Sequence, residues 1–428
     1  MKPTPLFLGL FFILLAARAE PPAFSLDAST QAALAHNPSI KEARAKWEAT
    51  KQRVPQAAAW DDLKVSASTR LARFVDVATN SFTDQMLSVE QMIPLSGKNQ
   101  SRARIAAAEA LGGLEELRRM ELDVVGKARS AFHRLAKDYA LLDINRANEA
   151  SLSQTLEISR ARFAVGTQTQ ADVLTAEGEL VRIIETRRDL QRALSDDETQ
   201  LKVLMNRDPF APLGKPVASE SHGALPSVER LRTLLLAQRP EVRMAEASGT
   251  GAKAKLELAK REWIPDPAVS IGTQRYNGAA QVASEVTAGI SFNVPWLNGK
   301  KYRAEESEAA SGVEAAQQGL ESARTEALGL LRDQLEKIET LHRHVGQFGE
   351  RLIPNARQTV QAHRTNYESG KSSFLELVLS QRSLREVESM AREHLADYEI
   401  ALAELEALVG ADLQLFSPRK ETSKRKSK

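Results

Sequence analysis

Residues 88–99, SVEQMIPLSGKN, and residues 289–301, GISFNVPWLNGKK, are two versions of one pattern. Each begins with alternating apolar residues, reaches a proline and passes through a short loop ending in Gly-Lys. A long segment rich in Ala and Glu follows each loop. A phosphate-binding loop requires a glycine five residues before the Gly of Gly-Lys and a Ser or Thr after the lysine. Both copies lack a glycine at that spacing and a Ser or Thr at that place. The pattern therefore indicates a junction between a strand and a helix.

Four residues define these two junctions. Pro94 and Pro295 would end the strands, because proline cannot donate a hydrogen bond to a ladder. Gly97 and Gly299 would let the backbone turn into the following helix. Two matching junctions in one chain point to an internal duplication.

The duplication extends along the whole chain. Aligning Pro38 with Pro240, an offset of 202 residues, brings Trp60 near Trp263 and superimposes the two Gly-Lys loops. Further matches follow in the same order, since residues 160–177 align with 364–381 and residues 201–206 with 405–410. We therefore expect two structural repeats, residues 20–205 and 228–412, joined by a proline-rich, non-helical linker at 206–227.

Short alternating segments precede both junctions. In residues 284–294, SEVTAGISFNV, apolar residues alternate with small or polar ones. Segments near ten residues with this alternation are typical of transmembrane β-strands. The predicted strands are about 63–74, 83–93, 268–275 and 284–294.

Long helices are predicted after the strands. The sequence from Lys98 has no proline before the linker and is dominated by Ala, Leu, Glu and Arg, while Pro354 should kink or break the helix of the second repeat. Apolar residues spaced by sevens indicate coiled-coil seams in the returning helices. The predicted helices are about 98–164, 171–205, 300–368 and 372–409.

Composition limits the class of protein. Residues 1–19 have the charged start, apolar run and A-x-A site of a secretory signal peptide. Cleavage after Ala19 would reduce 58 Lys and Arg to 56, equal to the 56 Asp and Glu. The chain has no cysteine, and its one basic cluster lies in a tail at 413–428 that we expect to be disordered. A nucleic-acid partner, which would need a basic surface, is not expected.

Four strands cannot close a membrane barrel, since the smallest have eight, and an open edge in lipid is forbidden. Two hypotheses follow. Either several copies share one barrel continued by a tube of helices, or the chain is a periplasmic coiled-coil scaffold or adaptor that binds partners without forming a pore.

Taken together, these motifs resemble those of the TolC-like outer-membrane factor family. The resemblance rests on Asn37-Pro38, RPEV at 239–242, the two proline-to-Gly-Lys junctions and the sequences FAVGTQTQADVL and YESGKSSFLELV. It implies a mainly α-helical fold with a small β part, in which a homotrimer forms a 12-stranded barrel in outer-membrane lipid and a periplasmic α-helical barrel. It also implies two partners, a periplasmic adaptor and an inner-membrane transporter. The IPLSGK motif resembles the heavy-metal and cation efflux branch, which works with resistance-nodulation-division transporters.

The same resemblance implies roles for residues at the helix ends. Val165, Gly166 and Thr167 match the family's tip motif for adaptor contact, and Gly370 occupies the second tip. Asp172, Glu376 and Tyr367 match gate positions, although Ser372 stands where the family has a basic gate partner. From the sequence alone, Asp172 and Glu376 could equally be acids on a solvated helix face near a helix start.

Aromatic residues mark the other end of the repeats. Trp60, Trp263 and Trp296 lie near the strand ends, where membrane-interface aromatics belong, although they could also be ordinary core residues.

His342 and His344 do not share a helix face, so no metal site is predicted. The sequence indicates no catalytic constellation and no cofactor, and the protein is not expected to be an enzyme.

Overall fold

The computed structural model describes residues 23–69, 85–217, 225–277 and 282–411. The predicted signal peptide and basic tail lie outside these residues. The helices are α1 (Leu26–His36), α2 (Pro38–Lys51), α3 (Arg53–Ala58), α4 (Lys98–Ala164), α5 (Gln170–Leu204), α6 (Val228–Gln238), α7 (Pro240–Arg261), α8 (Gly299–Gln347), α9 (Ile353–Glu368) and α10 (Phe374–Val409), with short turns η1 (Pro295–Asn298) and η2 (Phe348–Leu352). The strands are β1 (Lys64–Thr69), β2 (Gln85–Met92), β3 (Ala268–Asn277) and β4 (Val282–Ser291).

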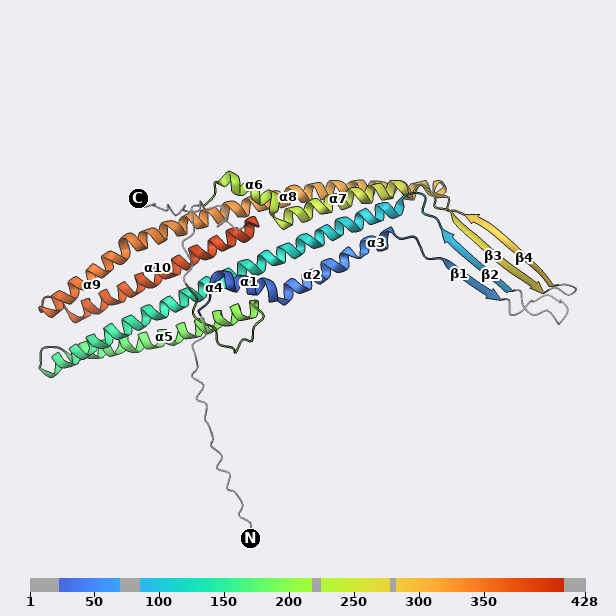
Figure 1. Ribbon diagram of the computed structural model, residues 1–428. Helices are drawn as coiled ribbons and strands as arrows, with labels where there is room; N and C mark the ends of the chain where they lie inside the picture. The colour runs from blue at the N-terminus through green and yellow to red at the C-terminus, as the bar shows by residue number, and fades with distance from the viewer. Residues whose placement is uncertain (1–22, 70–84, 218–224, 278–281, 412–428) are drawn as a thin grey trace, which may run out of the picture. The chain divides into compact units, whose positions relative to one another are not determined.

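The chain divides into two compact units, and the long helices α4 and α10 contribute to both. The sheet unit contains the described parts of residues 33–130, 221–346 and 397–428. The tip unit contains the described parts of residues 1–32, 131–220 and 347–396. Figure 1 labels the elements of both units.

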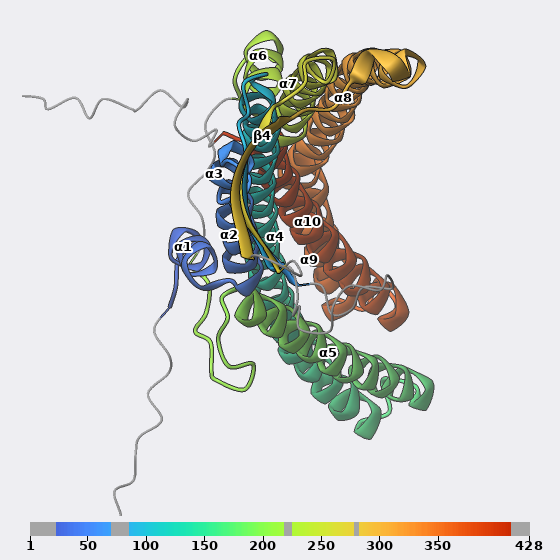
Figure 2. The same cartoon turned by 90° about the vertical axis from the view of Figure 1, so that its right-hand side faces the viewer.

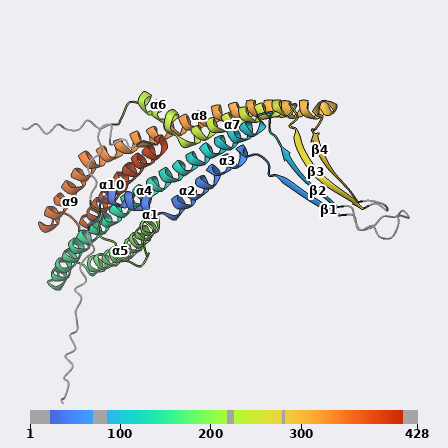
Figure 3. The ribbon, with the colours of Figure 1, turned by 45° about the vertical axis from the view of Figure 1, so that its right-hand side comes forward.

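One antiparallel sheet holds all four strands, in the order β1-β2-β3-β4. Strands β2 and β3 join the two repeats, whereas β1 and β4 are the outer strands (Figures 1 and 3). Strand β4 begins earlier than the predicted 284 and ends at Ser291, short of the predicted 294. Its partner β3 begins at Ala268, which faces Ser291. The preceding residue, Pro267, has no N–H to extend this pairing.

In the sheet unit, helices of the first repeat pack beside helices of the second. Trp47 of α2 lies against Gly113 of α4, 3.7 Å from a Cβ built there. A Cβ built on Gly251 of α7 would lie 3.3 Å from the Cβ of Ala108 on α4. Helix α7 lies between α4 and α8 (Figure 2), so the order is α2, α4, α7, α8.

Apolar side chains of α6, α7, α8 and α10 form the main core of the sheet unit. Leu231, Val242, Leu331 and Leu405 are its central members, each at most 2% exposed. The buried residues of α8 begin only at Ala327. Its first 28 residues therefore contribute no fully buried side chain to the chain's own core.

In the tip unit, α4 is followed by α5 and α9 by α10, each pair joined by a tight turn. Helix α8 continues into α9 through η2, a π-helical turn that ends just before Pro354. A wider turn accommodates the proline, so the helix is distorted where a kink or break was predicted, and it is not interrupted. The linker also contacts Phe24, whose N–H donates to the Lys215 oxygen (3.2 Å). The Phe24 ring in turn packs on Phe132 of α4.

No helix within the described ranges carries an apolar stretch long enough to cross a membrane.

A buried carboxyl lies between α4 and α5 in the tip unit. Asp138 is 1% exposed, and the Lys137 Nζ lies 3.3 Å from its Oδ1. Burial raises the pKa of Asp138 to about 6, since Lys137 opposes but does not offset the loss of water, and the nearby Asp197 charge adds to the rise. Asp197 itself pairs with Arg134 at 3.0 Å.

We predict that Asp138→Asn stabilises the tip unit at pH 7.5, by on the order of 1 to 3 kcal/mol. The folded chain retains this proton between pH 6 and the ordinary value near 3.8, where the unfolded chain loses it. Wild-type stability relative to the variant should therefore rise as pH falls through this window. Thermal unfolding at pH 4.5 and 7.5 measures the difference. Asp143→Asn, at an exposed pair with Arg146, is the control and should show little pH-dependent difference.

Candidate functional site

The turns at the two helix tips have the same backbone structure. Gly166 and Gly370 both have φ of +74°, the left-handed region that glycine adopts readily. In the first turn the Thr167 N–H donates to the Arg162 oxygen (3.0 Å), and in the second the Lys371 N–H donates to the Asn366 oxygen (2.8 Å). These bonds close each helix end in the manner of a Schellman cap. The duplication thus extends to individual hydrogen bonds.

Both predicted gate acids, Asp172 and Glu376, cap the returning helices. The Asp172 carboxylate accepts from the Thr169 hydroxyl (2.8 Å) and N–H (3.3 Å), and the Asp172 N–H donates to the Thr169 hydroxyl. Glu376 does the same for α10, accepting from the Ser372 hydroxyl (2.5 Å) and the Ser373 N–H (2.9 Å). Reciprocal capping of this kind stabilises a helix start. Hydrogen bonds from Ser372 and Ser373 lower the pKa of Glu376.

Tyr367, the third gate candidate, lies inside the tip unit. Its ring is 7% exposed and packs in a cluster with Leu156, Ala176, Phe374, Leu377 and Val378. The Tyr367 hydroxyl donates to the Gln168 side-chain oxygen at 2.6 Å. The Arg162 guanidinium lies 4.5 Å from the ring centre and donates to the Tyr367 carbonyl (3.3 Å). Tyr367 therefore fastens the second helix pair to the first.

The remaining tip candidates face solvent. Val165 is 73% exposed, and Thr167 beside it is also exposed. Among the described residues, no hydrogen bond or ion pair joins Asp172 to Glu376. The structure thus brings Tyr367 into contact with the first tip but leaves the two acids on separate helix starts.

At the first strand–helix junction, a buried lysine connects the two repeats. The Lys98 side chain is 10% exposed, and its Nζ lies 3.1 Å from Asp266 Oδ2 and 3.4 Å from Glu262 Oε2. The Ser96 N–H donates to the other Asp266 oxygen (3.0 Å), and Arg261 donates to the Ser96 carbonyl (2.9 Å). Burial alone would raise the pKa of Asp266, but the bonds from Ser96 and Lys98 lower it.

The predicted junction residues behave differently in the two copies. Gly97 has φ of +71°, and a side chain there would collide with Arg261. Gly299 has right-handed helical backbone, and a Cβ there would only touch the Trp263 ring, at 3.4 Å. Pro94 and Pro295 both follow the strand ends, and Pro295 is buried at the start of η1.

Of the three predicted interface aromatics, two are exposed. Trp60 is 61% and Trp296 57% exposed. Trp263 is half-buried and packs against Tyr302, with ring centres 5.5 Å apart. The exposure of Trp60 and Trp296 argues against the ordinary-core alternative for these two residues.

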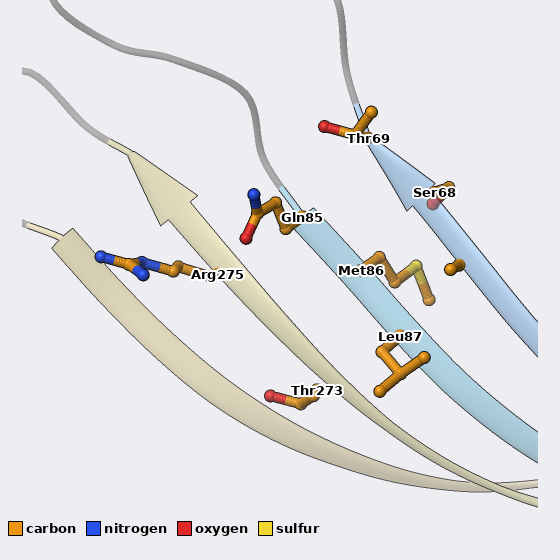
Figure 4. Close-up of a pocket in the computed structure, with 8 residues that line it drawn as sticks. Ser68, Thr69, Gln85, Met86, Leu87, Thr273 and Arg275 are labelled. Carbon is orange, nitrogen blue, oxygen red and sulfur yellow. The ribbon is translucent and has the colours of Figure 1, made fainter.

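A hollow of about 410 Å³ lies beside the far end of the sheet. Figure 4 shows its lining from three strands, with Ser68 on β1, Met86 and Leu87 on β2, and Thr273 and Arg275 on β3. No cluster of three or more His, Cys, Asp or Glu that could hold a metal ion occurs in the described part of the chain.

Sequence reasoning missed the partners that hold these sites together. Lys98 recurs as Lys300, and an acid two residues before each repeat's first strand recurs as Asp62 and Asp266. That double recurrence was the available signal for the junction ion pair. The Tyr367–Gln168 bond had no comparable signal, since its partners are 199 residues apart.

The model of the family described as outer membrane efflux protein matches residues 30–207 and 231–411. The pyoverdine export outer membrane protein OpmQ of Pseudomonas putida is 25% identical over 407 residues, which cover 92% of this chain and 82% of that protein. The nickel and cobalt resistance protein CnrC of Cupriavidus metallidurans is 31% identical over 105 residues, or 24% of each chain. Several other curated relatives match over 38% to 68% of their own length.

Solved structures share the fold. The crystal structure of CusC superimposes with a TM-score of 0.79 at 16% identity, covering 90% of this chain and 92% of that one. At this identity the likeness concerns architecture alone. It matches the predicted fold class, a mainly helical chain with a small sheet.

We predict that Lys98→Met destabilises the sheet unit by about 3 kcal/mol, because Asp266 would lose its cation in a poorly solvated site. Lys301→Met is the matched control, since its pair with Glu305 is more than one-third exposed on both sides and should be worth less than about 1 kcal/mol. Denaturant unfolding of the purified protein measures both. Equal effects of the two substitutions would contradict a structural role for the Lys98 pair.

Proposed function

The chain belongs to the outer membrane efflux protein family, and from that premise we propose that three copies of it form the exit duct of a tripartite efflux pump. The proteins of this family are non-enzymatic channels of the outer membrane. The observation that carries the trimer is the four-stranded sheet with two outer strands. Three such sheets supply twelve strands, an even number within the range of membrane barrels. Closure of the twelve strands into a barrel would give hydrogen-bond partners to the backbone groups of the outer strands, which lipid cannot provide.

The family assignment favours a channel over the scaffold alternative, and in our proposal the tips lie at the periplasmic end of the duct. Exposed Val165 and Thr167, with the turns at Gly166 and Gly370, form the proposed contact with a periplasmic adaptor. The second turn reads Ser369-Gly370-Lys371, so its contact differs chemically from the first. The adaptor would connect the duct to an inner-membrane transporter of the resistance-nodulation-division type.

Gating in this proposal is a movement of helix ends. Tyr367, held by Gln168 and Arg162, keeps the second helix pair against the first. Opening the duct would require these contacts to separate or to move as one body. In a trimer, Asp172 and Glu376 would each form a ring of three carboxylates, which attracts cations.

For the substrate we propose metal cations, supported by the IPLSGK motif and the partial similarity to CnrC, which is described as a nickel and cobalt resistance protein. Relatives over longer stretches are described as exporters of pyoverdine, toluene and solvents, and one as a protease secretion protein. The duct serves whatever its transporter delivers, so the substrate is settled by assaying the pump.

Channel formation is tested by purifying the protein from outer membranes, measuring its mass in detergent and reconstituting it in planar bilayers. We expect a trimer with discrete single-channel currents. Expression beside its pump should restore nickel or cobalt resistance to a strain lacking its own exit duct. A monomer that partitions to the soluble fraction and gives no currents would refute the proposed function, whereas currents with restored solvent but not metal resistance would refute the substrate alone.

The gate acids require substitutions that separate charge from helix capping. Asp172→Asn and Glu376→Gln remove the charge and keep an oxygen that can accept the capping hydrogen bonds. We expect a fall of at least about twofold in the cation-to-anion permeability ratio, since rings of carboxylates set cation selectivity. Thr169→Ala, which weakens the cap and keeps the Asp172 charge, is the control and should leave selectivity unchanged. Unaltered selectivity in both charge variants would assign the acids to capping only.

A further inference from the structure

The first repeat's junction lysine is paired within the chain, but the second repeat's lysine is not. Lys300 occupies the place of Lys98 in the second Gly-Lys loop, and its side chain is exposed. Asp62 occupies the place of Asp266 before β1 and is also exposed. No ion pair involving either residue is found among the residues that the structure describes. Each is one half of a site whose other half lies elsewhere.

We propose that Lys300 of one copy pairs with Asp62 of the next copy, repeating between chains the buried Lys98–Asp266 contact. The inference rests on the trimeric assembly proposed above and adds the residues that join its subunits. The partner is a second copy of this chain, and each chain offers both halves of the contact.

The correspondence of residues follows from two alignments. DLKVS at 62–66 aligns with DPAVS at 266–270, an offset of 204 that places Asp62 on Asp266. The stretch before the second junction aligns with an offset of 201, which places Pro94 on Pro295 and Val89 on Ile290. One inserted residue in the second loop then brings Lys98 onto Lys300.

The strand pairing tests these offsets independently. In the first hairpin Lys64 faces Glu90. Shifting the two residues by 204 and 201 gives Ala268 and Ser291, which are the facing residues in the second hairpin. The two repeats therefore share one register, and the alignment holds at the level of single residues.

Topology then requires the second contact to be intermolecular. The Lys98–Asp266 pair accompanies the pairing of β2 with β3, where the first repeat meets the second. The corresponding pair would accompany β4 with β1, where the second repeat meets a first repeat. Strands β4 and β1 are the two outer strands of the chain's own sheet (Figure 1). The first repeat that β4 meets must therefore belong to another copy.

The helices also show a missing neighbour: α8 has no helix beside it within the described part of the chain that corresponds to α7 beside α4 (Figure 2). Within the chain, α4 of the first repeat packs on α7 of the second through Ala108 and Gly251, and Arg243 lies 3.7 Å from Glu115. By the same correspondence, α8 would pack on α2 of the next copy. The first turns of α8, which contribute no buried side chain to the chain's own core, supply that surface.

The contact between copies has a different charge set from the contact within the chain. Arg261 and Glu262 of the second repeat align with Ala57 and Ala58 of the first. The intermolecular site therefore lacks the arginine that holds the Ser96 carbonyl and the second acid beside Lys98. Asp61, next to Asp62, supplies an additional carboxylate there.

The proposal also fixes the register between copies. Within the chain, Val89 faces Ile271 and Glu90 faces Ser270. Applying the two offsets places Ile290 opposite Ala67 of the next copy, and Ser291 opposite Ser66 of the next copy. Thr69 and Ser68, at the end of the same outer strand (Figure 4), follow in order.

Charge reversal tests the ion pair. Lys300→Glu and Asp62→Lys should each lower the temperature at which the trimer dissociates in detergent, and the double variant should recover at least half of the loss. Lys301→Glu, one residue away, is the control and should have little effect. If the single variants are as stable as wild type, or if the double variant loses the sum of both effects, the Lys300–Asp62 pair is refuted.

Cysteine crosslinking tests the register in a chain that has no cysteine of its own. Ser66→Cys with Ser291→Cys, and separately Ala67→Cys with Ile290→Cys, should give disulfide-linked dimers and trimers on non-reducing gels. Ser68→Cys with Ser291→Cys is displaced by two residues and should crosslink several-fold less. A wild-type trimer in which neither matched pair exceeds this control would overturn the proposed contact while leaving the channel function intact. A wild-type monomer would instead refute the trimer itself.

Discussion

The backbone of an outer β-strand has hydrogen-bonding groups on one side that the chain itself leaves unpaired. In this protein that constraint falls on β1 and β4, the two ends of a sheet built from two hairpins. In lipid each unpaired group would cost several kcal/mol, so such a sheet is viable there only when it closes on further copies. The requirement for trimerisation in our proposal is thus a consequence of strand number. The start of α8, which contributes no buried side chain before Ala327, is consistent with the same requirement.

The tips show how local and global roles can share one residue. Asp172 and Glu376 each lie three residues into a reciprocal cap, where a carboxylate satisfies N–H groups that the helix cannot. A carboxylate used in this way is held in one position and keeps its charge, as the lowered pKa of Glu376 reflects. Capping therefore does not compete with a role in ion selection. It would fix the position of the charge that the ring in a trimer presents.

Much of this fold could be predicted from the sequence because its determinants are local. Alternation predicted the strands, the proline-free runs predicted α4 and α5, and the glycines predicted both tip turns. Pro354 was expected to kink or break its helix, and the structure has a π-helical turn between α8 and α9 just before it. Gly299 was expected to turn the chain as Gly97 does, but its backbone is right-handed helical and Trp263 packs against it. Such packing depends on residues distant in sequence, which periodicity does not reveal.

The contact of the junction lysine Lys98 also joins residues distant in sequence, but here the internal repeat supplies a signal for it. Nothing local connects Lys98 to Asp266, which lies 168 residues later, yet both positions recur in the other repeat. In a duplicated chain, the residues that form a contact between the two repeats recur at corresponding positions. Here Lys98 and Asp266 form the contact, and Lys300 and Asp62 are the corresponding residues that do not pair within the described part of the chain. The internal junction has Arg261 and Glu262, whereas the first repeat has alanines at the corresponding places. In our proposal the contact between copies therefore keeps the lysine–aspartate pair without counterparts of Arg261 and Glu262, and Asp61 beside Asp62 offers a second carboxylate to Lys300.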